Sequence, residues 1–69
     1  MTEPDLASAR VMQWLASDYS HEARLFAHRA RNADGPVARS RYTAQAITLQ
    51  QEAAVRYAVA RKLLGVEDV

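Results

Sequence analysis

Carboxylates and imidazoles are the side chains with the clearest potential for chemistry in this sequence: Asp18, His21, Glu22 and His28, with Glu52 further along the chain. Asp18 and Glu22 are four positions apart and share a face of a helix. In di-iron proteins, carboxylates and histidines that face the interior of a four-helix bundle hold the metal through a Glu-x-x-His pattern. That pattern is absent here, because Leu25 stands three residues after Glu22. We therefore expect no metal ion or other cofactor, and interpret the acidic residues as surface charges that pair with Arg24 and Arg56.

Nucleophilic catalysis has no better support. The chain has no cysteine, and its serines lack the sequence context of a nucleophile elbow. Its two glycines lie thirty residues apart and form no phosphate-binding loop. A chain of 69 residues without these features offers little room for a substrate pocket. We predict that the protein is not an enzyme and has no small-molecule substrate.

Arginine is the other residue type whose distribution suggests a function. The formal charge is −3 over residues 1–23, +4 over residues 24–41 and zero over residues 42–69. The basic stretch contains five arginines: Arg24, Arg29, Arg31, Arg39 and Arg41. Arginine pairs well with phosphate, so one hypothesis is a nucleic-acid contact; the alternatives are a solvated surface or ion pairs with a partner's acidic residues. The isoelectric point of about 8.2 is below the value above ~9 that is typical of nucleic-acid-binding domains.

The positions of glycine and proline predict the elements that carry these residues. The segment Asn32-Ala33-Asp34-Gly35-Pro36 is a cluster of turn-forming residues between two long segments that lack glycine and proline. We predict a helix over about 4–32, a turn over 32–36, a helix over about 37–64 and a frayed tail over 65–69. Thr2, with an acidic residue three positions later, resembles a capping box, and Gly65 is typical of a helix C-terminal stop.

Apolar residues recur every three or four positions in both segments, which is the period of an amphipathic helix. The first stripe is Met12, Leu15, Tyr19, Ala23, Phe26, Ala30 and Ala33, and the second is Tyr42, Ala46, Leu49, Ala53, Tyr57, Ala60 and Leu64. A short turn makes two long helices antiparallel neighbours, with residue numbers at one level that sum to about 70. The predicted fold class is all-α, an antiparallel two-helix hairpin that forms one domain.

Further apolar residues lie outside these stripes: Val11, Trp14 and Leu25 in the first helix, and Ile47, Val55 and Val59 in the second. One seam between two helices does not cover so wide an apolar surface. A chain this short, without disulfides, usually relies on a partner chain for stability. We predict a homodimer of hairpins that forms a four-helix bundle. The alternative is a different chain that supplies the remaining helices.

These features favour a function in binding. The predicted protein interface consists of Val11, Trp14, Leu15, Tyr19, Leu25, Val55 and Val59. Trp14 is expected to be buried in the assembled state, either as an anchor for a partner or in the dimer core. We hypothesise an interaction or regulatory protein that acts as a homodimer and binds an unidentified protein partner. The alternative is a dimeric nucleic-acid-binding protein that uses the arginines near the turn.

Location is inferred from features that the sequence lacks. No apolar run approaches the ~18 residues of a membrane span, and the first residues do not have the pattern of a secretory signal. We expect a cytoplasmic protein without membrane contact. Eight arginines against one lysine, with abundant alanine, are typical of a GC-rich bacterial or phage genome.

Overall fold

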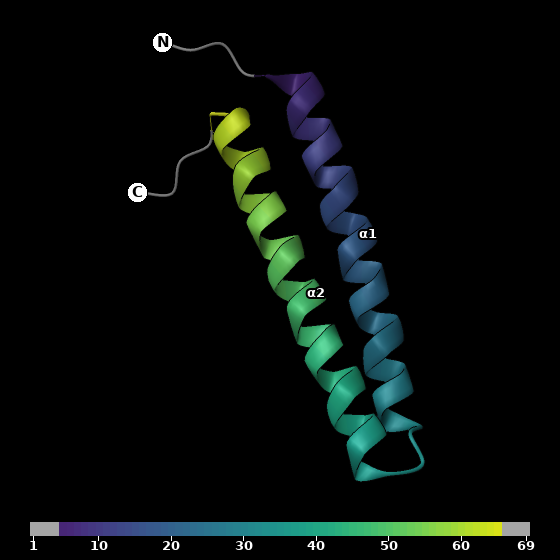
Figure 1. The fold of residues 1–69 in the computed structure, drawn as a ribbon. Helices are drawn as coiled ribbons and strands as arrows, with labels where there is room; N and C mark the ends of the chain where they lie inside the picture. The colour runs from purple at the N-terminus through teal and green to yellow at the C-terminus, as the bar shows by residue number, and fades with distance from the viewer. Residues whose placement is uncertain (1–4, 66–69) are drawn as a thin grey trace.

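The computed structural model describes residues 5–65, which form two α-helices, α1 (Leu6–Arg31) and α2 (Pro36–Leu63). The helices lie antiparallel and side by side, and the short segment after Arg31 joins them at one end of the rod (Figure 1). This is the all-α hairpin that the sequence predicts. The Cα trace measures 54 × 23 × 11 Å, so the molecule is long and flat.

The start of α1 is capped by Asp5, whose side-chain carboxylate accepts a hydrogen bond from the Ser8 backbone N–H at 3.0 Å. The helix therefore begins two residues after the predicted start. The predicted cap Thr2 and residues 66–69 of the predicted tail lie outside the described residues. At the other end, the Asn32 side-chain amide donates to the His28 carbonyl at 2.9 Å and closes the last turn of α1.

Helix α2 begins at Pro36, where the missing N–H of proline costs no helical hydrogen bond. It ends at Leu63, and Leu64 is its C-cap residue. Gly65 follows with φ of +75°, in the left-handed region that glycine adopts readily. The stop signal that the sequence places at Gly65 is therefore the one that the structure uses.

Every buried residue in the described part of the chain is an alanine. We name this set the alanine line: Ala9, Ala16, Ala23 and Ala30 on α1, and Ala46, Ala53 and Ala60 on α2. The spacing is seven residues on both helices, which is the repeat of a coiled coil. The small side chains let the two backbones approach closely, because the interaxial distance depends on the side chains at the contact.

Larger side chains stand three positions after every alanine of the line except Ala30, and together with Tyr42 they form a second, half-buried line. We name this set the outer line: Met12, Tyr19 and Phe26 on α1, and Tyr42, Leu49, Arg56 and Leu63 on α2. The Asp5 N–H donates to the Leu63 carbonyl at 2.9 Å, and the Phe26 and Tyr42 rings lie 6.1 Å apart. Residues at the same level therefore have numbers that sum to about 68, two fewer than the sequence suggested.

The seven-residue repeat changes which residues face the seam at the end of α2. The expected stripe continued through Tyr57 and Leu64, but Tyr57 is 42% exposed and Arg56 is half-buried instead. In α1 the residue that faces the seam at this level is Ala16, which is fully buried, and not Leu15 as the stripe predicts. The predicted stripe follows the 3.6-residue period of a straight helix, whereas a coiled coil keeps a period of 3.5 residues.

Candidate interaction surface

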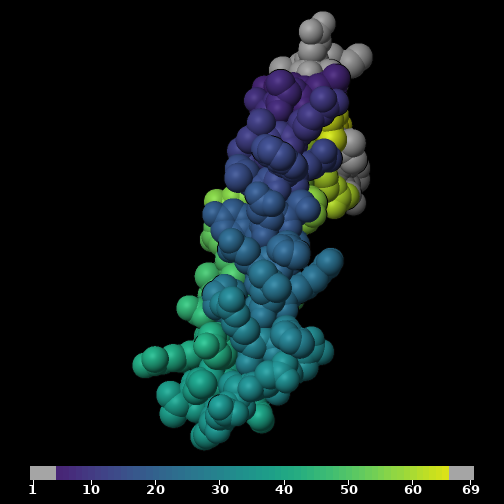
Figure 2. Space-filling model, turned by 90° about the vertical axis from the view of Figure 1, so that its right-hand side faces the viewer, coloured from purple at the N-terminus to yellow at the C-terminus, as the bar shows by residue number. Residues whose placement is uncertain are grey.

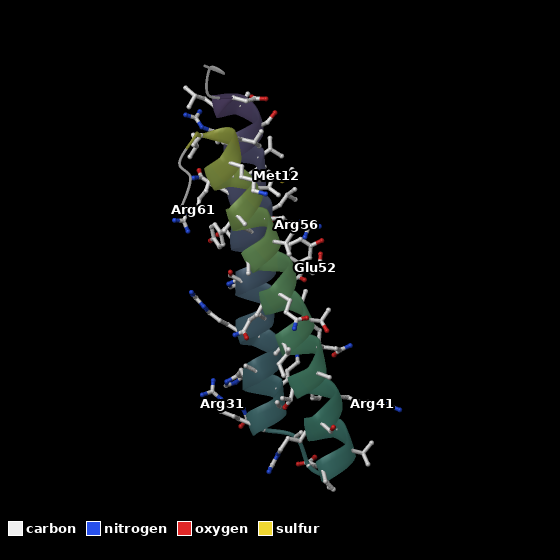
Figure 3. All side chains as sticks on the ribbon, turned by 90° about the vertical axis from the view of Figure 1, so that its left-hand side faces the viewer. Met12, Arg31, Arg41, Glu52, Arg56 and Arg61 are labelled. Atoms are coloured by element: carbon white, nitrogen blue, oxygen red, sulfur yellow. The ribbon has the colours of Figure 1, made fainter. Side chains whose placement is uncertain are left out.

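The two lines divide the hairpin into two broad faces. Each residue of a seven-residue repeat advances about 103° around the helix. Residues two and six positions after an alanine of the line therefore lie on the side of the outer line. Residues one and four positions after it lie on the other side of the alanine line. Met12, Arg41, Glu52 and Arg56 accordingly lie along one edge in Figure 3, and Arg31 and Arg61 along the other. We name the first side the apolar face and the second the arginine face.

The apolar face collects six of the seven residues of the predicted interface: Val11, Leu15, Tyr19, Leu25, Val55 and Val59. Tyr19 is half-buried in the outer line, and the other five are exposed, from 37% for Val59 to 58% for Val55. Beside them lie half-buried Met12, Phe26 and Leu49, which the sequence assigned to the seam alone. The heptad spacing of the alanines is the signal that places these residues on the same face.

Shallow hollows run along the apolar face. One that spans both helices has a volume of about 350 Å³ and lies between Glu22 and Phe26 of α1 and Gln45 and Leu49 of α2. Smaller hollows lie beside Val11 and beside Leu15 on α1. These hollows are open to solvent, and their walls combine half-buried apolar side chains with a few polar ones.

Trp14 is the predicted interface residue that the structure separates from the others. Its side chain is 76% exposed, the most exposed of the large apolar residues. It lies five positions after Ala9, on the outer side of α1 away from α2. Seen from the side of α1, the molecule is a narrow rod with side chains that stand out near the turn (Figure 2). Trp14 therefore belongs to the outside of the hairpin and contributes nothing to its seam.

Arg56 is the charged residue of the outer line. Its guanidinium lies 4.4 Å from the centre of the Tyr19 ring and donates to the Glu52 carboxylate at 2.6 Å. The same nitrogen also donates to the Glu52 carbonyl at 3.1 Å. The Arg56–Glu52 pair was expected from the sequence, but the contact with Tyr19 was not. Arg56 thus joins α2 to α1 on the apolar face.

The other acidic residues of this face have no such partners. Asp18 and Glu22 are exposed and line the hollow beside Leu15. Neither forms the expected ion pair with Arg24 in the part of the chain that the structure describes. Across residues 5–65, no group of three or more histidine and acidic side chains is close enough to hold a metal ion.

The five arginines near the turn do not form one patch. Arg24 and Arg31 follow an alanine of the line by one position and lie on the arginine face. Arg29 and Arg41 lie on the apolar side, and Figure 3 shows Arg31 and Arg41 projecting in opposite directions. The Arg29 guanidinium lies 5.1 Å from the centre of the Phe26 ring. Arg39 is exposed and continues the alanine line one heptad before Ala46.

Comparison of the chain with protein-family models, curated proteins and solved structures finds no match. Neither helix in the described part of the chain is long and apolar enough to cross a membrane.

Proposed function

We propose that this chain is a non-enzymatic interaction or regulatory protein that acts as a cytoplasmic homodimer and binds a protein partner. The main support for the proposal is that the seam buries small side chains, whereas the apolar face leaves larger apolar side chains exposed. The seam buries alanines, each of which removes little apolar area from water. The larger apolar side chains, such as Leu15, Val55 and Val59, remain exposed on one face of the hairpin.

A second copy of the chain is the occupant that fits this face best. Two packed helices of 26 and 28 residues are about 40 Å long and, with their side chains, about 20 Å across. One face of the hairpin therefore offers roughly 800 Å², which is about the area that a stable interface buries on each partner. A twofold interface requires one surface to carry both ridges and hollows, since each copy presents the same patch. The apolar face carries both, in the exposed valines and leucines and in the hollows beside Leu15 and Phe26. The result is a four-helix bundle in which the half-buried outer lines form the centre.

The external partner is assigned to the side of the bundle that carries Trp14. When two hairpins pack through their apolar faces, Trp14 stays on the outer side of α1, next to Val11 at the edge of the interface. Tryptophan is among the residues that contribute most to protein interfaces. An exposed Trp14 with a neighbouring apolar edge therefore suits a contact with a different protein.

Sedimentation equilibrium tests the dimer. The parent chain is expected at twice the monomer mass of 7.7 kDa. The double variant Leu15→Glu, Val59→Glu places charges on the apolar face and is expected to weaken association at least tenfold. The control Ile47→Glu changes a similarly exposed apolar residue, 48% accessible, on the arginine face and is expected to stay dimeric. A monomeric parent chain at micromolar concentration would overturn the proposal, as would equal weakening by the control.

The fluorescence of Trp14 tests its position in the dimer. Trp14 is the single tryptophan of the chain, so its emission reports one site. We expect emission at solvent-exposed wavelengths that does not change as the protein is diluted through dissociation. A blue shift that disappears on dilution would place Trp14 in the dimer core and remove the site assigned to the partner.

A further inference from the structure

The arginine face has a composition unlike that of the rest of the surface. It carries Arg10, Arg24 and Arg31 on α1, with Arg61 on α2 (Figure 3 labels Arg31 and Arg61). Most of the side chains between them are hydrogen-bond donors: Gln13, Ser17, Ser20, Ser40, Thr43 and Gln50. Arginine, serine, threonine and glutamine are the side chains that commonly bind phosphate oxygens of nucleic acids.

The acidic residues of the two helices lie away from the arginine face. Between residues 6 and 63, neither helix places an aspartate or glutamate on this face. The acidic residues of the helices, Asp18, Glu22 and Glu52, all lie on the apolar side. The near-neutral net charge of the chain therefore separates into a face of purely positive formal charge and a face of mixed charge. Such a separation produces a local positive potential that the net charge of +1 conceals.

We propose that the arginine face binds the phosphate backbone of a double-stranded nucleic acid. Arg10, Arg24 and Arg31 lie in one row at intervals of 14 and 7 residues, which is about 21 and 10 Å along a helix. A straight row of this length spans about one turn of a duplex, whose repeat is ~34 Å. The rigid seam of alanines holds the row straight, so the cations meet a regular array of phosphates without ordering a flexible segment.

The shape of the hairpin favours contact with the backbone over reading of the bases. The major groove is about 12 Å wide and admits one helix, whereas two packed helices with their side chains extend about 20 Å across. Single strands are bound by rows of aromatic side chains on which bases stack. The arginine face presents one exposed aromatic residue in the described range, Tyr57. The ligand is therefore the duplex backbone, with little preference for sequence.

An anionic membrane is a less suitable ligand for this face. Helices that lie on membranes place bulky apolar side chains beside their cations and insert them among the lipids. Here serine, threonine and glutamine occupy most of the positions around Arg24 and Arg31. The arginine face is also on the opposite side from the apolar face. Binding of a duplex and formation of the dimer therefore use different residues and fail independently.

Fluorescence anisotropy with labelled 24-base-pair DNA and RNA duplexes tests the proposal. Non-specific binding with Kd of about 10⁻⁶ to 10⁻⁴ M is expected, with three phosphate contacts that give a slope of log K against log salt near −2.7. Affinity is then expected to fall about 40-fold between 50 and 200 mM salt. The duplex that binds more tightly shows whether the ligand is double-stranded DNA or double-stranded RNA.

Two double variants with equal charge change provide the decisive comparison. Arg24→Gln with Arg31→Gln removes two cations of the row and is expected to reduce the fall in affinity over the same salt range to about fourfold. Arg29→Gln with Arg41→Gln removes two cations near the same end of the molecule but on the apolar side, and is expected to leave duplex binding within about twofold. Circular dichroism and sedimentation confirm that both variants keep the helices and the oligomeric state of the parent.

Several outcomes would overturn the inference. Absence of duplex binding at 50 mM salt, or binding that does not depend on salt, removes it. Equal losses in the two double variants indicate attraction to general charge and not to the arginine face. Tighter binding to a single strand, to vesicles with 30% anionic lipid or to polyglutamate than to either duplex identifies a different class of partner.

Discussion

The two faces of the hairpin contribute differently to the molecule, although both are built on the same line of alanines. On the apolar face the outer line adds a second layer of contact between the helices, with the Phe26–Tyr42 ring pair and Arg56 over Tyr19. On the arginine face most flanking residues are serine, threonine, glutamine and exposed arginine side chains, with Ile47 and Tyr57 among them. From this difference we expect the apolar face to contribute more to the stability of the fold than the arginine face.

Enlarging a residue of the seam itself is expected to have the largest effect, because both faces depend on it. Ala16 is fully buried at the level of Ala53, where no space is left for a longer side chain. Ala16→Leu is expected to lower the free energy of unfolding by about 1–3 kcal/mol. Urea denaturation followed by circular dichroism measures this change. The control Ala58→Leu, at an exposed position of α2, is expected to stay within about 0.5 kcal/mol of the parent.

The close approach of the helices is what this pair of variants tests. Alanine and leucine have similar helix propensities, so a difference between the two variants reports packing and not helix formation. Equal stability of Ala16→Leu and the parent would mean that the seam has room for larger side chains. The separation into two faces by a tight line of alanines would then be wrong.

Removing an aromatic ring from each face compares the faces directly. Phe26 is half-buried against Tyr42, whereas Tyr57 is exposed on the arginine face. Phe26→Ala is expected to cost about 2 kcal/mol, roughly half the cost for a fully buried phenylalanine. Tyr57→Ala is expected to cost less than about 1 kcal/mol. Thermal unfolding measures both, and equal losses would contradict the greater contribution of the apolar face.

Removal of an arginine from each face is expected to give a smaller difference in stability. Arg56→Ala removes the contact with Tyr19 and the pair with Glu52, both partly exposed to solvent, and is expected to cost about 1 kcal/mol. Arg24→Ala removes an exposed side chain and is expected to change stability by less than about 0.5 kcal/mol. Unfolding at low and high salt separates the contributions, since salt screens the ion pair more than the packing of Arg56 on the ring. Identical values for the two variants would show that the Arg56 contacts add nothing.

The sequence predicted the two helices, the turn and the antiparallel arrangement because glycine, proline and the apolar period act locally. It also selected six residues that the structure brings to one face, since an exposed leucine or valine beside a helical stripe is visible as a pattern. It missed Ala9 and Ala16 as the centre of the seam. Alanine buries little apolar area, so larger residues dominate an apolar pattern even where alanines recur every seven residues.

The net charge of successive segments of the chain does not predict how the arginines divide between the two faces. Residues 24–41 carry the greatest positive charge, but consecutive arginines on a helix project in different directions. Arg29 and Arg31 are two positions apart and lie on opposite faces. Arg10 lies far from the basic stretch in sequence and joins Arg24 and Arg31 in space through the seven-residue repeat. Assignment of a cation to a face required the register of the seam, which only the buried alanines define.

The smallest expected effect lies at the end of the rod away from the turn, where Asp5 caps α1. The Ser8 N–H and the Ser8 side chain bond to the Asp5 carboxylate and hold its pKa below the ordinary value of 3.8. Because the pKa is lower in the folded state, the ionised carboxylate stabilises the fold above the unfolded pKa. That stability is lost as the pH falls through the folded pKa.

Asp5→Asn keeps an oxygen that accepts the Ser8 hydrogen bond but removes the charge near the N-terminus of α1. The parent is expected to melt slightly above this variant near neutral pH, with the difference shrinking below about pH 4 as the carboxylate takes up a proton. Thermal melts of both proteins from neutral to acidic pH measure the difference between their melting temperatures. Because both proteins contain the same other carboxylates, the effect of their titration cancels in this difference. A gap that stays constant over this range would show that the Asp5 charge has no role and that the cap acts through its hydrogen bond alone.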